Sequence, residues 1–191
     1  MSKNIEIEIR AILTKDEYEK VLSSLTNYTS YSQTNYYLDD SKLSFSNNYH
    51  GLRIREKDHK YELTLKQKIN NDYLEINQEI TAKIKENMVN PGYFPSGEVF
   101  DYLTKNKLID PKNIYIVCKL KTTRIDINYE GTIISLDKNE YFDITDYNIE
   151  CESINNNEVE KTLTIFLSKF GIQLKKSPIT KLEKALSKLK Q

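Results

Sequence analysis

Charged residues occupy every second position in five short β-like segments, and each segment leans to one sign. The segments are 6–10 (EIEIR), 53–55 (RIR), 66–68 (KQK), 75–79 (EINQE) and 150–152 (ECE). Successive side chains of a strand point to opposite faces, so each segment places its charges on one face and mostly apolar or neutral residues on the other. This sorting favours a pocket in which cations bind phosphates and carboxylates bind a metal.

The overall composition limits the size and the partners of the chain. Its 191 residues allow one ordinary domain or two small ones, and we expect a single domain over 1–191. The 28 basic residues balance the 28 acidic ones. Because a general nucleic-acid binder normally carries a basic excess, this balance predicts no nucleic-acid partner.

Targeting and redox signals point to the cytoplasm. The sequence has no apolar run of about 18 residues, which predicts no membrane span, and its first residues lack the apolar stretch of a secretory signal. Cys118 and Cys151 lie between charged strand positions, which predicts two buried free thiols rather than a disulfide or a metal site.

Hydrophobic periodicity predicts an α+β chain rich in strands. A capping box of Thr14 and Glu17 begins a helix over 15–26, Thr81 begins a short helix, and Ser96 is expected to cap another. A helix over 158–170 ends at Gly171, and a last helix begins either after residues 177–178 or at Thr180. Strands are expected at 5–13, 29–38, 52–57, 61–69, 73–81, 115–123, 124–129, 132–138 and 146–153.

About eight antiparallel strands of this kind can close into a barrel with room for one small ligand. The charges could face solvent around an apolar interior, or they could line the interior while the helices cover the apolar faces. The second arrangement is favoured because each major helix has an apolar stripe that requires an apolar sheet face. In addition, like charges about 4 Å apart repel by roughly 4 kcal/mol at an effective dielectric of 20, which a bound polyanion would relieve.

The acidic segments predict a metal site. Glu6, Glu8, Glu150 and Glu152 would repel one another on neighbouring strands unless a divalent cation bridges them. No histidine accompanies them at ligand spacing, and oxygen ligands suit hard ions. The expected cofactor is therefore Mg²⁺ or Mn²⁺.

The ordered set of these segments resembles the CYTH superfamily, also called triphosphate tunnel metalloenzymes. EIEIR is similar to the family's ExExK signature, and the later segments are similar to its basic and acidic strands. The matching elements are 6–10 (EIEIR), 35–39 (NYYLD), 52–55 (LRIR), 63–66 (LTLK), 123–124 (TR), 136–137 (LD), 149–152 (IECE) and 180–181 (TK). They cover nearly the whole chain in the family's order.

The resemblance implies an eight-stranded antiparallel β-barrel, open as a tunnel, with a charged lumen and helices packed outside. By position it implies metal ligands at Glu6, Glu8, Asp137, Glu150 and Glu152. It implies phosphate binding by Arg53, Arg55, Lys66, Lys68, Arg124 and Lys181. Glu75 or Glu79 would contact the metal or its water, and Lys119 has a weaker claim to the lumen.

One position departs from the family pattern. Arg10 stands where the family has lysine. Arginine grips phosphate through two donors but stays protonated, whereas the pKa of lysine can be tuned. If the family's lysine handles a proton or positions water, turnover by Arg10 would be slow, or Lys66 would take over that role.

The leading hypothesis is metal-dependent hydrolysis of a small triphosphate: tripolyphosphate, thiamine triphosphate or a nucleoside triphosphate. One alternative is a class IV type adenylate cyclase, which forms cyclic AMP and pyrophosphate from ATP. The other is a non-catalytic triphosphate or polyphosphate binder. Loops 40–50 and 82–113 are the candidates for recognising the group beyond the triphosphate, and the chain is expected to be a monomer or a homodimer.

Overall fold

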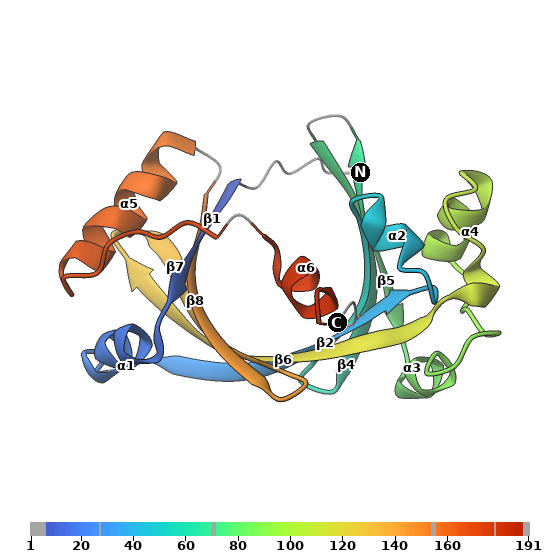
Figure 1. Ribbon diagram of the computed structural model, residues 1–191, viewed down its shortest axis with the longest axis horizontal. Coiled ribbons are helices and arrows are strands. Elements are labelled where there is room, and N and C mark those ends of the chain that lie inside the picture. Colours follow the sequence, from blue (N-terminus) through green and yellow to red (C-terminus); the bar gives the residue numbers. More distant parts are fainter. Residues whose placement is uncertain (1–6, 27, 70–71, 154–155, 178, 189–191) are drawn as a thin grey trace. The chain divides into compact units, whose positions relative to one another are not determined.

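The computed structural model describes residues 7–26, 28–69, 72–153, 156–177 and 179–188 (Figure 1). In these residues the strands are β1 (Ile7–Leu13), β2 (Thr29–Asp39), β3 (His50–Lys57), β4 (Lys60–Ile69), β5 (Asp72–Ile80), β6 (Tyr115–Tyr129), β7 (Thr132–Tyr141) and β8 (Ile144–Ser153). The helices are α1 (Lys15–Ser23), α2 (Ser44–Asn47), α3 (Ala82–Asn87), α4 (Glu98–Lys105), the 3-10 turn Pro111–Asn113, α5 (Asn156–Ser168) and α6 (Lys181–Leu186).

The strands form one eight-stranded sheet in the order β1-β8-β7-β6-β2-β3-β4-β5. The pairs β1–β8, β7–β8, β2–β3, β3–β4 and β4–β5 are antiparallel. This confirms the predicted α+β fold with an eight-stranded antiparallel sheet and helices. Closure of the sheet into a tunnel stays a prediction.

The chain divides into two compact units. In the described residues, unit 1 comprises the segments up to Ser32 and from Lys121 to Thr180. Unit 2 comprises the segments from Gln33 to Leu120 and from Lys181 onward. Each unit contains its own apolar core and its own charged sheet face, so each is described separately.

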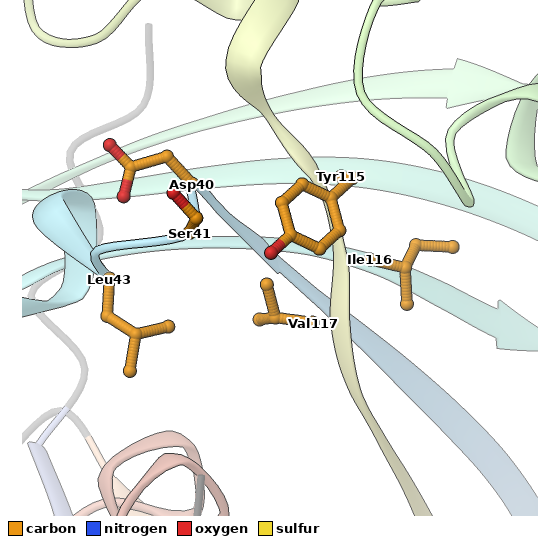
Figure 2. Close-up of a pocket in the computed structure, with 6 residues that line it drawn as sticks. All are labelled: Asp40, Ser41, Leu43, Tyr115, Ile116 and Val117. Carbon is orange, nitrogen blue, oxygen red and sulfur yellow. The ribbon is translucent and has the colours of Figure 1, made fainter. Parts of the chain in front are cut away.

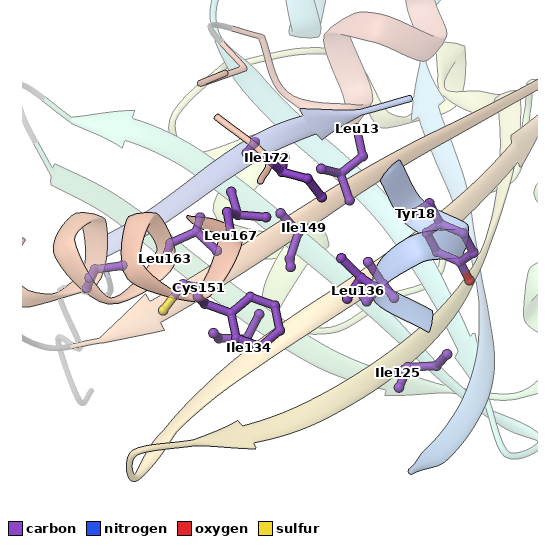
Figure 3. Packing of buried hydrophobic residues seen from close by; sticks show 14 residues of the cluster. Leu13, Tyr18, Ile125, Ile134, Leu136, Ile149, Cys151, Leu163, Leu167 and Ile172 are labelled. Atoms are coloured by element: carbon purple, nitrogen blue, oxygen red, sulfur yellow. The ribbon is translucent and has the colours of Figure 1, made fainter. Parts of the chain in front are cut away.

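The core of unit 1 lies between one face of its sheet and two helices. Ile149 and Cys151 on β8 and Leu136 on β7 are fully buried in one cluster with Leu163 and Leu167 of α5 and Tyr18 of α1 (Figure 3). Figure 1 shows α1 and α5 on the same side of these strands. Burying a leucine side chain of this kind stabilises the fold by about 1.5–3 kcal/mol. The apolar positions of the alternating strands therefore face the helices, as predicted.

The core of unit 2 follows the same rule. Leu52 and Ile54 on β3 and Leu63 on β4 are buried in one apolar cluster with Val99 and Leu103 of α4. The alternate residues of β3 and β4 consequently lie on the sheet face away from α4. In both units, then, the apolar positions that the alternation predicts are buried on the face of the sheet that carries the core.

Helix α1 begins as the sequence predicts. The Thr14 hydroxyl accepts from the Glu17 amide at 3.2 Å, and the Glu17 carboxylate accepts from the Thr14 amide at 2.7 Å. This backbone hydrogen bond to Thr14 is the largest cause that lowers the pKa of Glu17. The helix ends at Ser23, three residues before the predicted end.

Two predicted segments differ in the structure. Residues 115–129 form a single strand, β6, rather than two. The expected polar loop after β2 contains the short helix α2. Asp39 stabilises this turn because its carboxylate accepts from the amides of Phe45 and Ser46 at 3.0 and 2.9 Å.

The predicted cap of α4 by Ser96 is wrong. The N-cap residue of the helix is Gly97, which has no side chain that could accept a hydrogen bond from the first turn. Instead, Gln78 of β5 accepts from the Val99 amide at 3.2 Å and donates to the Ser96 carbonyl at 2.8 Å. A side chain from the preceding strand therefore satisfies the helix terminus, which no local sequence pattern reveals.

Replacing Gly97 with alanine should destabilise the protein by about 1 kcal/mol or more. Gly97 has φ +134°, and a Cβ there would lie 2.5 Å from the side-chain amide of Gln78. Gly92 is the matched control, because it also has a positive φ (+111°), but a Cβ added there would meet no atom within 4 Å. Urea unfolding should show a larger loss for Gly97→Ala than for Gly92→Ala, and equal losses would contradict the role of Gln78.

The remaining fold predictions concern thiols and membranes. Cys118 and Cys151 are buried free thiols, as expected. Burial raises the pKa of Cys118 to about 11. In the described part of the chain, no helix has the length and apolar character needed to cross a membrane.

Candidate functional site

Two arginines and two carboxylates meet on the polar sheet face of unit 1. Arg124 on β6 donates from Nε and Nη2 to Asp137 on β7, at 2.8 and 2.7 Å. The same Nη2 contacts Glu150 on β8. Arg10 on β1 donates from Nε to the other Glu150 oxygen at 2.5 Å. We call Arg10, Arg124, Asp137 and Glu150 the carboxylate–arginine cluster.

Strand alternation and register bring this cluster together. Leu136 and Ile149 point into the core of unit 1, so the next residues, Asp137 and Glu150, lie on the opposite face. Arg10 and Glu150 are direct partners across β1 and β8. Residues opposite each other in an antiparallel pair share a face, which explains the contact between two side chains 140 residues apart.

The carboxylates of the cluster are buried, its arginines are partly buried, and its formal charges balance. The side chains of Asp137 and Glu150 are 0% and 4% exposed, and those of Arg10 and Arg124 are 17% and 15% exposed. Burial alone would lower the pKa of Arg124, but hydrogen bonding to Asp137 and the charges of both carboxylates outweigh it and raise the pKa. Arg124 is therefore held as a cation between the two carboxylates.

This pairing corrects part of the charge argument. The sequence suggested that cations and anions crowd separately and require a ligand to relieve repulsion. Here Arg10 and Arg124 neutralise Glu150 and Asp137 directly, and Lys66 lies 4.0 Å from Glu75. The register between neighbouring strands thus brings opposite charges together, although each single strand carries mainly one sign of charge.

The predicted metal ligands are only partly described. Asp137 and Glu150 lie together, Glu6 lies outside the described residues, and the side chains of Glu8 and Glu152 are not described either. The backbones of Glu8 and Glu152 are partners in the β1–β8 register, two residues beyond Arg10 and Glu150.

Among the described residues no group of three His, Cys, Asp or Glu is arranged to hold a metal. The donors present are carboxylate oxygens, since Cys151 points into the core on the other face. Oxygen donors without nitrogen or sulfur fit a hard divalent ion such as Mg²⁺ or Mn²⁺.

A series of hydrogen-bonded, uncharged polar residues leads to the two carboxylates, and sequence reasoning missed it. Asn148 donates to Glu150 at 3.1 Å and to Asp137 at 3.4 Å. Asn139 donates to Asn148, and Thr122 donates to Asn139. Their spacing in the sequence could have identified them. Asn148 stands two residues from Glu150 and Asn139 two residues from Asp137, so each lies on the same strand face as a predicted metal ligand.

The predicted phosphate-binding arginines of unit 2 lie side by side on β3. Arg53 is opposite Thr64 of β4, and Arg55 is opposite Glu62. On the other flank Arg55 is opposite Asn35 of β2. Asn35 is 3% exposed, and its Oδ1 is buried with no hydrogen-bond partner in the described residues. A polar ligand or a water beside Arg55 would satisfy this oxygen.

The lysines of unit 2 are more exposed. Lys66 is 53% exposed, so its 4.0 Å approach to Glu75 contributes less than about 1 kcal/mol. Lys68 lies 5.9 Å from the ring centroid of Tyr49. Lys119 lies 5.8 Å from the ring centroid of Tyr36, which packs on the apolar core of unit 2. Glu79 is exposed and lies opposite Glu62.

Lys181 is the first residue of α6, which agrees with the helix start predicted at Thr180. The next residue, Leu182, approaches within 3.5 Å of the position that a Cβ of Gly51 would occupy. Gly51 is opposite Lys66 in the β3–β4 register. Helix α6 therefore begins close to the sheet face that carries Arg53 and Lys66.

A pocket of about 240 Å³ lies in unit 2, between the end of β2 and the start of β6 (Figure 2). Its lining residues are Asp40, Ser41, Leu43, Tyr115, Ile116 and Val117. One carboxylate oxygen of Asp40 already accepts hydrogen bonds from the Lys42 and Ser44 amides, both at 2.9 Å. The pocket includes part of the 40–50 segment that was expected to recognise the variable end of a ligand.

Comparison with known families agrees with this arrangement of basic and acidic strands. The CYTH domain family matches residues 4–186. The chain belongs to the CYTH domain family, as the segment order suggested.

Individual relatives extend over the same length. A protein of Bacillus subtilis strain 168, provisionally named triphosphatase YjbK, is 34% identical over 175 residues, which are 90% of each chain. A crystal structure from Bacillus halodurans, provisionally named an adenylate cyclase, is 30% identical, with a TM-score of 0.83 and coverage of 96% and 98%. HpAC1 from Hippeastrum, at 23% identity, shares the fold with a TM-score of 0.79 over 96% and 95% of the chains.

Proposed function

We propose that this protein hydrolyses the terminal phosphate of a small triphosphate with the help of Mg²⁺ or Mn²⁺. The carboxylate–arginine cluster carries the proposal, because it combines buried oxygen donors for a cation with guanidinium donors for phosphate. The Bacillus subtilis relative, provisionally named a triphosphatase, supports the same reaction class. Phosphoryl transfer depends mainly on positioning and charge neutralisation, which these residue types provide.

Each proposed role follows from the chemistry of the residue. Asp137 and Glu150, with Glu6, Glu8 and Glu152, would hold the divalent ion, and Glu75 or Glu79 would contact metal-bound water. The ion would neutralise charge on the phosphate oxygens. The cations proposed to bind the phosphate chain are Arg53, Arg55, Lys66, Lys68, Arg124 and Lys181.

Arg124 has two roles in this proposal. In the structure its guanidinium neutralises Asp137 and Glu150. The same planar group can bind a phosphate through two parallel donors. Arg124 would thus exchange a carboxylate partner for a phosphate oxygen when metal and substrate bind together.

Arg10, which replaces the family's lysine, should act mainly as the counterion of Glu150. Its Nε contact at 2.5 Å supports a charge role, which lysine can also fill. We expect Arg10→Lys to retain activity within about tenfold and Arg10→Met to lose more, because methionine leaves Glu150 without this cation. Steady-state rates of phosphate release for the two variants check this. If the rate of phosphate release by Arg10→Lys exceeds the wild-type rate by well over tenfold, Arg10 instead limits turnover.

The direct test is phosphate release from tripolyphosphate, thiamine triphosphate and ATP with Mg²⁺ or Mn²⁺. We expect metal-dependent orthophosphate from at least one of them, well above a Glu150→Gln variant. If the wild type releases no more phosphate than the Glu150→Gln variant from any of these substrates, the proposed hydrolase activity is refuted.

A second candidate is cyclisation of ATP, because the 30% identical Bacillus halodurans protein is provisionally named an adenylate cyclase. Cyclic AMP and pyrophosphate would replace orthophosphate among the products. A non-catalytic triphosphate binder would instead give a thermal shift without products. Ligand at a hundred times its dissociation constant should then stabilise the fold by about 2.7 kcal/mol.

A further inference from the structure

We propose that Asn148 is a positioning residue that fixes Asp137 and Glu150 for the divalent cation, and that Asn139 and Thr122 fix Asn148 in turn. This inference rests on the proposed metal site of unit 1. We call Thr122, Asn139 and Asn148 the amide chain. Nothing in their residue types marks them as ligands, and their role follows from their contacts.

The side chain of Asn148 lies between the two carboxylates. It is the direct cross-strand partner of Asp137 and stands two residues before Glu150 on the same strand face. Its Nδ2 donates to Glu150 Oε1 at 3.1 Å and to Asp137 Oδ2 at 3.4 Å. One neutral group thus connects both carboxylates and adds no charge that would compete with a divalent ion.

The other contacts of the amide chain fix the direction in which Asn148 points. The Thr122 hydroxyl donates to Asn139 Oδ1 at 2.8 Å. Asn139 Nδ2 then donates to Asn148 Oδ1 at 2.5 Å and to Asp146 Oδ1 at 3.0 Å. With its oxygen committed to Asn139, Asn148 must present its nitrogen to the carboxylates. A reversed amide would place its oxygen against two acceptors.

The amide chain is buried and anchored at its far end. Thr122, Asn139 and Asn148 are 0%, 1% and 4% exposed. Asp146, which also accepts from Asn139, accepts from the Tyr141 hydroxyl at 2.7 Å. Buried polar groups that are all paired hold one geometry, because any rotation leaves a donor or acceptor unsatisfied.

Polar partners of this kind orient the ligands of protein metal sites. Their replacement typically weakens metal affinity or activity by about 10–100-fold. We therefore expect the amide chain to control how tightly the carboxylates hold a divalent ion. Replacing Asn148 should have the strongest effect. Replacing Thr122 should have a weaker one, because two hydrogen bonds separate it from Asn148.

A matched pair of variants at Asn148 tests this role. Threonine and valine have nearly the same shape, but only threonine carries a hydroxyl, which can donate to one of the two carboxylates. Mn²⁺ binding to the substrate-free full chain can be titrated by electron paramagnetic resonance of the free ion. We expect Asn148→Val to weaken Mn²⁺ binding about tenfold or more. Asn148→Thr should stay closer to the wild type.

A second pair tests the rest of the amide chain. Thr122→Val removes the hydroxyl that orients Asn139, whereas Thr122→Ser keeps it. We expect a weaker Mn²⁺ affinity for Thr122→Val than for Thr122→Ser, and a smaller loss than at Asn148. Thermal unfolding of each metal-free variant shows whether the fold is retained.

The outcomes separate this inference from the proposed function. A wild-type protein that binds no Mn²⁺ would refute the proposed metal site and the role of Asn148 with it. If the wild type binds Mn²⁺ and both Asn148 variants bind it as tightly as the wild type does, the metal site stands and the positioning role is refuted. Variants that lose thermal stability but keep Mn²⁺ affinity would likewise show a purely structural role.

Discussion

Replacing Glu150 with glutamine should reduce metal-dependent triphosphate hydrolysis by about 10²-fold or more. Glutamine keeps the shape but removes the charge that faces Arg10, Arg124 and the proposed metal ion. A bound metal contributes several kcal/mol to charge stabilisation, and each 1.36 kcal/mol corresponds to about a factor of ten in rate. The measurement is kcat/KM for phosphate release with Mg²⁺ or Mn²⁺.

The matched control for this prediction is Glu140→Gln. Glu140 lies on β7, as Asp137 does, but three residues further along and on the other strand face, where it pairs with Lys138 at a partly exposed position. Its replacement should leave the rate nearly unchanged. Equal rates for Glu150→Gln, Glu140→Gln and the wild type would show that the carboxylate–arginine cluster takes no part in the reaction.

Replacing Arg124 with methionine should destabilise the metal-free protein by about 3–5 kcal/mol, because it leaves Asp137 and Glu150 as buried charges without their main cation. Urea unfolding in the presence of a chelator measures this loss. Saturating Mg²⁺ or Mn²⁺ should restore part of it, since a ligand at a hundred times its dissociation constant adds about 2.7 kcal/mol to the folded state.

Arg53→Met is the comparison for this second prediction. Arg53 lies on the polar face of unit 2 opposite Thr64 rather than between two buried carboxylates. Its loss should destabilise the protein less, and the metal should not reverse the effect. An Arg124→Met variant that is as stable as the wild type, or that gains nothing from either metal, would contradict the proposed exchange between arginine and cation.

The features that sequence could predict depend on short-range rules. The capping box of Thr14 and Glu17 needs only a spacing of three residues, and it forms as expected. The alternation in 149–152 places Glu150 on the face opposite Ile149 and Cys151 whatever strand lies beside it. The family resemblance then supplied the order of the acidic and basic strands.

The features that sequence missed depend on contacts between distant segments. Gln78 satisfies the first turn of α4, where the local pattern pointed to Ser96. The register that pairs Arg10 with Glu150 joins strands at opposite ends of the chain. Asn148 was overlooked because a neutral amide on a strand has no distinctive signal until both of its carboxylate partners are placed.

The central claim is that the carboxylates of unit 1 hold a divalent ion for a triphosphate substrate. A crystal of the protein grown with Mn²⁺ and a non-hydrolysable triphosphate tests it most directly, through the anomalous signal of manganese. We predict a manganese peak within coordination distance of Asp137 or Glu150, with Arg124 turned toward a phosphate oxygen. Manganese and phosphate bound elsewhere, with Arg124 still held between Asp137 and Glu150, would contradict the account.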